Sequence, residues 1–252
     1  MENMPITQLA GWKFYNLEDH VRFGKWATEV FYPVWMKSPY ITGINRYQII
    51  KENPEYCTYI STYHFINLKA FINHWKNPES ANIIKDMVTT WGNKRDVLWG
   101  YLYQPERSIY NTALAESIKK ELNSDDAPCI HIEAFDLSRE QEGEYYSWFT
   151  DMGDEVFMSR VMKRSGILGY DHFRLLSVGW SYNELEYVTP KERFGPPYVL
   201  IFYFDGVQHC LDFTNSRELA AFRVGLTPYF PEGLKLKWNV DYKLIGSWKR
   251  DK

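Results

Sequence analysis

The chain has 252 residues, of which 45% are hydrophobic and 24% charged, and its formal net charge is −3. This composition predicts folded cores and excludes a globally disordered chain. A mildly acidic chain without a basic cluster is not expected to bind nucleic acid. No apolar run approaches the ~20 residues that span a bilayer, so we expect no membrane partner.

Cysteine usage and aromatic content add two expectations. The three cysteines are widely spaced, and the N-terminus lacks a basic and an apolar signal region, which predicts a cytoplasmic protein with reduced thiols. Aromatic residues make up 17% of the chain. Such rings suit the stacking of a planar ligand, but they also fill wide barrel interiors and subunit interfaces. Both interpretations stay open, and a homodimer is compatible with the second.

The first half is predicted to run β-α-β-β-α-β. In chain order its elements are a strand at 12–17, a helix at 20–37, strands at 41–51 and 56–65, a helix at 67–91 and a strand at 97–103. Pro33 is expected to kink or restart the first helix, and Asn77-Pro78 to interrupt the second. A short amphipathic helix with a polar end is expected to connect the two halves.

The second half is predicted to repeat this order. Its elements are a strand at 128–135, a helix from the Ser138 cap to about 164, a strand at 166–178, a loop-rich insertion at 179–197, a β-rich stretch at 198–213, a helix from 215 and a closing strand at 234–248. Asp205-Gly206 interrupts the β-rich stretch, as either a tight hairpin turn or a bulge in one long strand.

An internal repeat underlies this symmetry. Gly43 and Gly169 lie 126 residues apart, and the same offset pairs Glu29-Val30-Phe31 with Glu155-Val156-Phe157. The match runs without a gap from a helical pattern into a strand pattern, which indicates one supersecondary unit used twice. We therefore expect a first ferredoxin-like repeat at 1–108, a helical connector at 109–127 and a second repeat at 128–252.

Two such units predict an α+β fold in which each of two antiparallel sheets has helices on one face and is bare on the other. The bare faces are expected to pack face to face as a barrel. With the segments 41–47, 167–173 and 213–222, the chain resembles a tandem member of the dimeric α+β barrel superfamily. That superfamily includes EthD-like proteins, antibiotic-biosynthesis monooxygenases, muconolactone isomerases and polyketide cyclases, so the resemblance constrains the fold more than the reaction.

Strand alternation selects candidate site residues. If the apolar partners Tyr47, Ile49, Phe173 and Leu175 face the helices, the alternate residues point into the barrel. This rule predicts that Arg46 and His172 occupy equivalent interior positions. The interior residues of the second half are then expected to be His131, Glu133, Phe135, Tyr170, His172 and Arg174.

These residues suggest acid–base chemistry. His172, assisted by Glu133 or His131, is expected to remove an acidic proton, and Arg174 to stabilise the resulting enolate. The substrate is expected to contact Tyr170, Phe135, Arg46 and Trp180. A purely structural alternative is a buried ion-pair network that satisfies its own polar groups.

Metal and haem sites are weaker alternatives. If His131, His172 and His209 lay on neighbouring strands, their imidazoles could bind one zinc or iron ion. Some members of the resembled superfamily bind haem through a helical histidine, for which His74 is the nearest analogue. No dinucleotide, P-loop or nucleophile-elbow motif occurs.

The resemblance implies a cofactor-independent enzyme that acts on a small aromatic or polyketide-like molecule. A cyclase, an isomerase or an oxygenase would fit equally. The alternatives are a non-catalytic binding protein for a hydrophobic ligand and a metal- or haem-dependent enzyme of the same fold.

Overall fold

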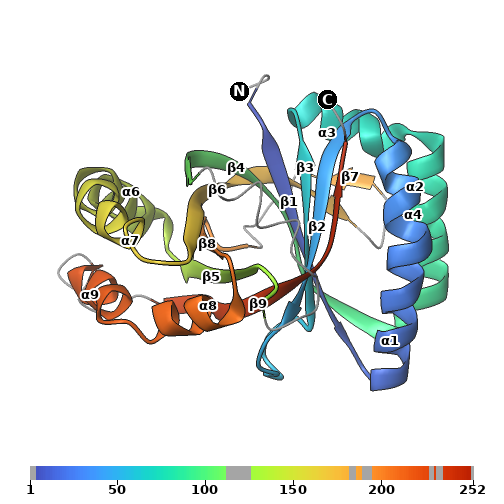
Figure 1. The fold of residues 1–252 in the computed structure, drawn as a ribbon. Helices are drawn as coiled ribbons and strands as arrows, with labels where there is room; N and C mark the ends of the chain where they lie inside the picture. Colours follow the sequence, from blue (N-terminus) through green and yellow to red (C-terminus); the bar gives the residue numbers. More distant parts are fainter. Residues whose placement is uncertain are drawn as a thin grey trace. The chain divides into compact units, whose positions relative to one another are not determined.

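The computed structural model describes residues 4–111, 126–181, 186–188, 195–226, 230 and 235–250. The fold is mixed α+β (Figure 1). Its chain divides into two compact units: unit 1 comprises residues 1–105, 175–194 and 245–252, and unit 2 comprises residues 106–174 and 195–244. This division differs from the predicted boundaries because parts of the second half belong to unit 1. Most of the predicted connector, 112–125, lies outside the described residues.

The sheet of unit 1 is antiparallel, with the strand order β4-β1-β3-β2. Its strands are β1 (Ile6–Phe14), β2 (Ile41–Ile49), β3 (Tyr59–Phe65) and the first part of β4 (Arg95–Tyr110). The C-terminal end of β9 (Lys235–Lys249) lies beside β2, where the Arg250 amide donates to the Thr42 carbonyl at 3.2 Å. The hairpin predicted from the two β-rich runs at 41–65 is confirmed.

The helices of unit 1 begin where the sequence offers caps. They are α1 (Leu17–Trp26), the π-helix η1 (Ala27–Phe31), α2 (Tyr32–Lys37), α3 (Leu68–Lys76), α4 (Pro78–Trp91) and the short 3₁₀ turn η2 (Gly92–Lys94). Asn16, Asn67 and Asn77 accept backbone amides at the first turns of α1, α3 and α4. Pro78 occupies the first turn of α4 after the extended Asn77, so the predicted interruption there is confirmed. Pro33 occupies the first turn of α2, but the backbone stays helical from η1 into α2.

The sheet of unit 2 is also antiparallel, with the order β9-β5-β8-β6. Its strands are β5 (Cys129–Asp136), β8 (Tyr198–Phe204), the first part of β6 (Ile167–Ser181) and most of β9. The end of β4 lies beside β6, where the Asn111 amide donates to the Leu168 carbonyl at 2.7 Å. A short strand, β7 (Glu186–Val188), pairs with the far end of β6.

The helices of unit 2 are α6 (Arg139–Trp148), the π-helix η3 (Phe149–Met158), α7 (Ser159–Val161), α8 (Val207–Thr214) and α9 (Arg217–Leu226). Ser138 and Gln141 form a capping box that starts α6, as the predicted Ser138 cap requires. The β-rich assignment of 198–213 is wrong beyond Phe204. Asp205-Gly206 is neither a hairpin turn nor a bulge but the junction between β8 and α8, where Gly206 is the N-cap.

The two sheets share a local irregularity. The register of β2 against β3 shifts between Ile41 and Gly43, and that of β6 against β8 shifts between Ile167 and Gly169. At Gly169 an added Cβ would lie 2.5 Å from the Ile109 carbonyl oxygen, which explains why glycine occupies this bulge. Every residue from Cys129 to Phe135 is buried, so both faces of β5 are covered.

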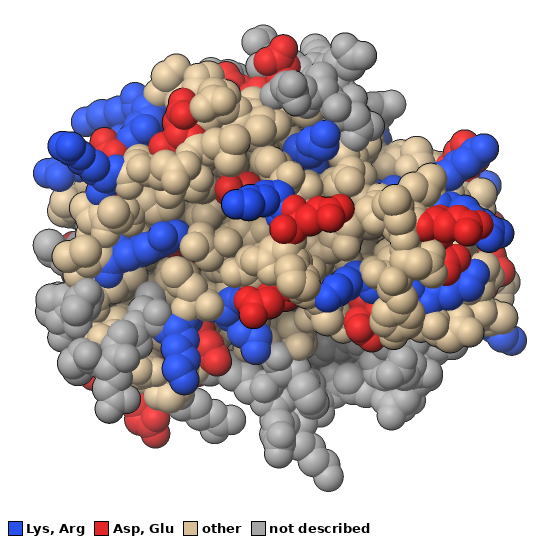
Figure 2. Space-filling view, turned by 90° about the horizontal axis from the view of Figure 1, so that it is seen from below, with Lys and Arg blue, Asp and Glu red and all other residues tan. Residues whose placement is uncertain are grey.

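The described surface and the three cysteines do not narrow the class of function. In the part of the chain that the structure describes, no helix is both long and apolar enough to cross a bilayer. On the face in Figure 2, the described basic and acidic side chains are interspersed rather than gathered in a basic stripe. All three cysteines are buried and form no disulfide.

Candidate functional site

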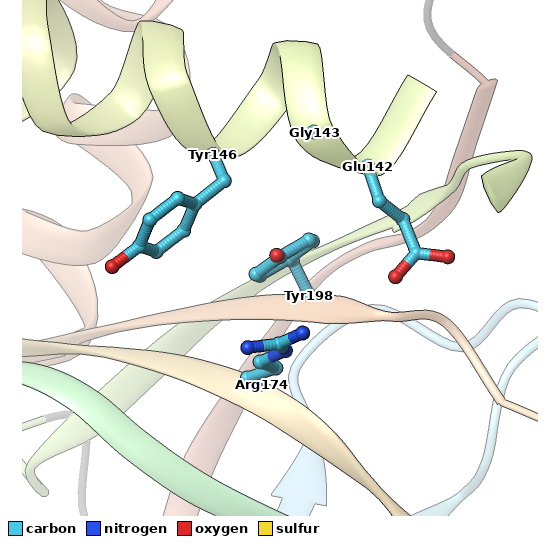
Figure 3. Close-up of a pocket in the computed structure, with 5 residues that line it drawn as sticks. All are labelled: Glu142, Gly143, Tyr146, Arg174 and Tyr198. Atoms are coloured by element: carbon cyan, nitrogen blue, oxygen red, sulfur yellow. The ribbon is translucent and has the colours of Figure 1, made fainter. Parts of the chain in front are cut away.

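A pocket of about 400 Å³ lies between helix α6 and the sheet of unit 2. Its lining residues are Glu142, Gly143 and Tyr146 of α6, Arg174 of β6 and Tyr198 of β8 (Figure 3). Figure 3 shows the Tyr146 side chain descending from α6 and the Arg174 side chain beside the Tyr198 ring. The two aromatic rings and one guanidinium therefore face the same space.

Local structure explains this lining. The capping box of α6 fixes the start of the helix, and the spacing of Glu142 and Tyr146 puts both on one side of it. Tyr145, one residue earlier, points into the core and is fully buried. At Gly143 nothing lies within 4 Å of an added Cβ, so the helix leaves open space at this point of the pocket wall. In the sheet, Arg174 and Tyr198 are cross-strand partners.

The pocket lining contains one basic side chain, Arg174, one acidic side chain, Glu142, and two phenols. The Arg174 side chain is 58% exposed, and its Nη1 lies 3.6 Å from Oε1 of Glu106. Burial raises the pKa of Glu106, and the Arg174 charge offsets part of that effect. Burial also raises the pKa of Tyr198 to about 12, so this phenol keeps its proton at neutral pH. Arg174 can thus attract an anion while Tyr198 donates a hydrogen bond.

His172 lies two residues before Arg174 but in the core. It is 1% exposed, and its ring stacks on Phe149 at 3.9 Å and on Tyr198 at 5.3 Å between centroids. Burial lowers its pKa to about 3, so the imidazole is neutral. The described contacts include no hydrogen bond or ion pair between His172 and Glu133 or His131. The structure therefore connects His172 to the pocket through the Tyr198 ring and does not supply the predicted carboxylate partner.

His131 and Glu133 instead belong to a buried ionic network. His131 Nδ1 lies 2.8 Å from Asp241 Oδ1, and its Nε2 lies 3.5 Å from Glu133 Oε1. Glu133 Oε1 also accepts hydrogen bonds from Arg223 Nε at 2.9 Å and Nη2 at 2.5 Å. We call Asp241, His131, Glu133 and Arg223 the β5 network. This arrangement matches the structural alternative considered for these two residues.

Electrostatics favour the charged forms of His131 and Glu133. Burial disfavours protonation of His131, but the hydrogen bonds and charges of Asp241 and Glu133 outweigh it and raise the pKa. Burial likewise disfavours the Glu133 carboxylate, yet hydrogen bonds and charges from His131 and Arg223 lower its pKa. In the order Asp241, His131, Glu133 and Arg223, the network alternates acidic and basic side chains along unit 2.

The predicted orientation of the site residues is wrong. His172 packs on Phe149 of η3, Glu133 pairs with Arg223 of α9, and Arg46 donates to the Gly24 carbonyl of α1 at 3.0 Å. The side chains of these polar residues lie on the face of each sheet that the helices cover, and not on the face that was predicted to line a barrel. The apolar alternation misleads here because both faces of the strands are buried, so hydrophobicity does not reveal which face meets a helix.

The remaining predicted residues are dispersed. Phe135 packs on Tyr145, with ring centroids 5.2 Å apart, and Tyr170 packs on Phe202 at 6.3 Å. Neither lines the pocket described above. Arg46 belongs to unit 1. Trp180 lies in β6, but its side chain lies outside the described residues.

Sequence reasoning missed Tyr198, Tyr146 and Glu142. A usable signal for the latter two was their i, i+4 spacing directly after a capping box. It also missed Asp171, a buried carboxylate on the sheet face opposite His172. Asp171 accepts hydrogen bonds from the Ser108, Tyr110 and Tyr203 hydroxyls.

The predicted three-histidine metal site does not form. His209 lies on α8 rather than on a strand, with Nδ1 2.5 Å from Asp205 Oδ1. His131 is engaged with Asp241, and His172 is enclosed by aromatic rings. Within the described ranges, no group of three or more histidine, cysteine, aspartate or glutamate side chains is arranged to hold a metal ion.

His74 also does not fit a haem ligand. His74 is fully buried, and its Nδ1 bonds to Ser38 Oγ at 2.8 Å. Its ring contacts Trp35, Phe65 and Trp75, which fill the space that a macrocycle would need. None of the pocket-lining residues is a histidine.

Comparisons with known proteins identify the fold. No protein-family model matches the chain, and no curated protein matches its sequence. Among solved structures, a candidate monooxygenase from Fusobacterium nucleatum subsp. nucleatum has a TM-score of 0.59 and 10% identity, covering 99% of this chain and 96% of that one. An anthrone oxidase-like protein has a TM-score of 0.62 and 8% identity, covering 100% and 97%.

A variant chlorite dismutase from Candidatus Nitrospira defluvii is also similar, with a TM-score of 0.53 and 10% identity, covering 97% of this chain and 92% of that one. These similarities extend over nearly the whole chain, and they show that it shares the fold of these proteins. Because the identities are so low, they establish no shared reaction.

Proposed function

We propose that the protein is an enzyme that acts on a small planar aromatic molecule, without a cofactor, in the pocket under α6. The observation that carries this proposal is the placement of the exposed Arg174 guanidinium beside the rings of Tyr146 and Tyr198. Flat rings bind a planar ligand, and a guanidinium binds the anionic oxygen of a phenolate, enolate or carboxylate.

The proposed chemistry is proton removal next to a carbonyl. Glu142 is the proposed base because it is the carboxylate that lines the pocket. Arg174 and the Tyr198 hydroxyl would stabilise the enolate oxygen as its charge develops. We assign His172 a positioning role through its stack on Tyr198, since an imidazole with a pKa of about 3 is a weak base at neutral pH. Cyclisation, isomerisation and reaction of the enolate with dioxygen all begin with this step.

A tandem origin is part of the proposal. Both units have the same strand order, the same bulge before the central glycine and a π-helix after the first helix. These shared features support two ferredoxin-like repeats within the chain.

The binding step is tested with 2-naphthoate, a planar aromatic carboxylate. Arg174→Gln is expected to weaken its binding by tenfold or more, because a charge-assisted hydrogen bond is worth about 1.5–3 kcal/mol. Isothermal titration calorimetry measures the affinity. Glu144→Gln is the matched control, because Glu144 is exposed on the same helix and lies outside the pocket lining. Equal affinity of Arg174→Gln and wild type would refute the assigned anion contact.

The catalytic step is tested with anthrone, a carbon acid chosen from the anthrone oxidase-like neighbour. One anthrone and one O₂ give one anthraquinone and one water, which an absorption assay and an oxygen electrode follow together. Glu142→Gln is expected to slow turnover by about a hundredfold, as loss of a positioned general base does. His172→Phe, which keeps a ring in the stack, should retain most activity. Ligand binding without any turnover would favour a non-catalytic carrier.

A further inference from the structure

The arginine of the pocket has a carboxylate partner that lies outside the pocket lining. Glu106, on β4, places its Oε1 3.6 Å from Nη1 of Arg174. That distance exceeds the length of a hydrogen bond, and it joins one oxygen to one nitrogen. Elsewhere in unit 2, Arg223 binds Glu133 through two nitrogens, at 2.9 and 2.5 Å. The Glu106–Arg174 pair is loose by comparison, so a ligand that enters the pocket competes with Glu106 for the guanidinium.

The two partners differ in their access to water. The Arg174 side chain is 58% exposed, whereas that of Glu106 is 17% exposed. Oε2 of Glu106 is buried and has no hydrogen-bond partner among the described residues. Burial raises the pKa of Glu106, and the charge and hydrogen bond of Arg174 act against that rise. A half-buried carboxylate that loses its cation takes up a proton more readily.

The other ionisable groups at this position cannot replace Arg174 as a counter-charge. They are Tyr145, Tyr146 and Glu142 of α6 and Tyr198 of β8. Burial raises the pKa of Tyr145 and Tyr198, in the latter case to about 12, and the Glu106 charge adds to both effects. Both phenols therefore keep their protons at neutral pH. In the part of the chain that the structure describes, Arg174 is the cation that pairs with Glu106.

We propose that Glu106 determines the charge of the ligand that the pocket accepts. With Glu106 ionised, Arg174 is engaged and the pocket takes a neutral carbonyl compound or phenol. When a proton from the solvent neutralises Glu106, Arg174 is released and binds the oxygens of a carboxylate or phenolate. An anion therefore binds together with one proton, which forms an O–H bond on Glu106. This inference rests on the function proposed above, because it concerns the same pocket and the same arginine.

Charge balance is the physical reason for this coupling. Arg174 is the basic side chain of the lining, and the acidic side chains of Glu106 and Glu142 act on the same region. A ligand anion that entered without a proton would place a further negative charge beside that one cation. Protonation of Glu106 removes one negative charge as the ligand brings another. The occupied pocket then has the same net charge as the empty pocket, and Glu142 keeps its role as the proposed base.

The test is a calorimetric titration of the full chain with 2-naphthoate in buffers of different ionisation enthalpy, which measures the protons taken up per ligand. Wild type is expected to take up about one proton, and its affinity to fall about tenfold from about pH 6 to about pH 8, where the ligand itself stays ionised. Glu106→Gln should bind 2-naphthoate without proton uptake and with a pH-independent affinity. The neutral analogue 2-naphthamide should bind wild type and Glu106→Gln equally well.

Two further variants assign the proton. Glu142→Gln should still take up a proton with 2-naphthoate, because Glu142 is not the group that the ligand displaces from Arg174. Glu144→Gln is the matched control for the loss of one negative charge, since Glu144 is exposed on α6 and lies outside the lining. It should behave as wild type does.

NMR of the glutamate side-chain carboxyl carbons gives a readout that needs no ligand. Arg174→Gln should raise the proton affinity of Glu106 by about tenfold, the lower end of the range for loss of an opposite charge, because Arg174 is largely exposed. An unchanged pKa of Glu106 in Arg174→Gln, or proton uptake that persists in Glu106→Gln, would overturn this inference alone. If neither naphthalene ligand bound wild type or Glu106→Gln, the proposed function would fall, and this inference with it.

Discussion

Replacing Arg223 with leucine is expected to lower the free energy of unfolding by about 3–5 kcal/mol, the range seen when one partner of a buried ion pair is removed. Glu133 is 0% exposed and receives two hydrogen bonds from Arg223 through one oxygen. Its other oxygen, Oε2, has no hydrogen-bond partner among the described residues. Without Arg223, the carboxylate would remain buried with only His131, at 3.5 Å, to offset its charge.

The comparison for this prediction is another arginine–glutamate pair in unit 2. Arg164 and Glu218 have the same 2.5 Å nitrogen–oxygen distance, and Arg164 is 30% exposed, like Arg223 at 32%. The glutamates differ, since Glu218 is 45% exposed and Glu133 is 0% exposed. Arg164→Leu should therefore cost no more than about 1 kcal/mol. Urea denaturation followed by circular dichroism measures both variants. Equal, small losses would mean that burial does not govern the β5 network.

The same network predicts a pH dependence. The pKa of His131 is raised above 6.5, so its contribution is fully present below that pH and is lost as the pH rises through the folded pKa. The pKa of Glu133 is lowered from 4.5, so its contribution is present above that pH and is lost as the pH falls. The stability difference between wild type and His131→Gln should peak between these two values. A pH-independent difference would contradict this assignment.

Gly169→Ala is expected to destabilise the protein by about 3 kcal/mol, at the upper end of the range for overpacking. The added Cβ would lie 2.5 Å from the Ile109 carbonyl oxygen and 3.0 Å from the Tyr110 Cα. Both are backbone atoms at the end of β4, so relief requires a shift of the strand and not a rotation of one side chain. Chemical denaturation of the variant gives the size of the loss.

Gly43→Ala is the control that the repeat itself provides. There the nearest atom to an added Cβ is the Trp248 carbonyl oxygen at 3.4 Å, which needs a displacement of only tenths of an ångström. The expected cost is below about 1 kcal/mol. If the two alanine variants lost equal stability, the close approach at Gly169 would not be the reason for that glycine.

Local signals predicted much of the secondary structure. Asn77-Pro78 indicated an interruption and Ser138 indicated a helix cap, and in the structure both Asn77 and Ser138 accept backbone amides of a first turn. The strand prediction for 198–213 was wrong beyond Phe204, because the aromatic and branched residues of this stretch are equally compatible with a buried strand and a helix. Gly206 supplies no side-chain cap that would have marked the change.

The candidate site was harder to predict than the fold. Arg174 was identified and lines the pocket, whereas Tyr198 became visible as its partner only once strand pairing was known. His131 and Glu133 were correctly grouped, but their partners Asp241 and Arg223 come from a later strand and helix. Such contacts depend on register and helix placement, which a single sequence does not specify.

The way the chain alternates between the two units has a consequence for its synthesis. Unit 1 begins at the N-terminus but also contains residues 245–252. The C-terminal residues of β9 complete the sheet of unit 1 beside β2, where Ser247 Oγ donates to Asn45 Oδ1 at 2.8 Å. A nascent chain therefore cannot finish folding unit 1 until residues 245–252 have left the ribosome. Ribosome-bound chains that stop before residue 245 should stay sensitive to protease across their first hundred or so residues.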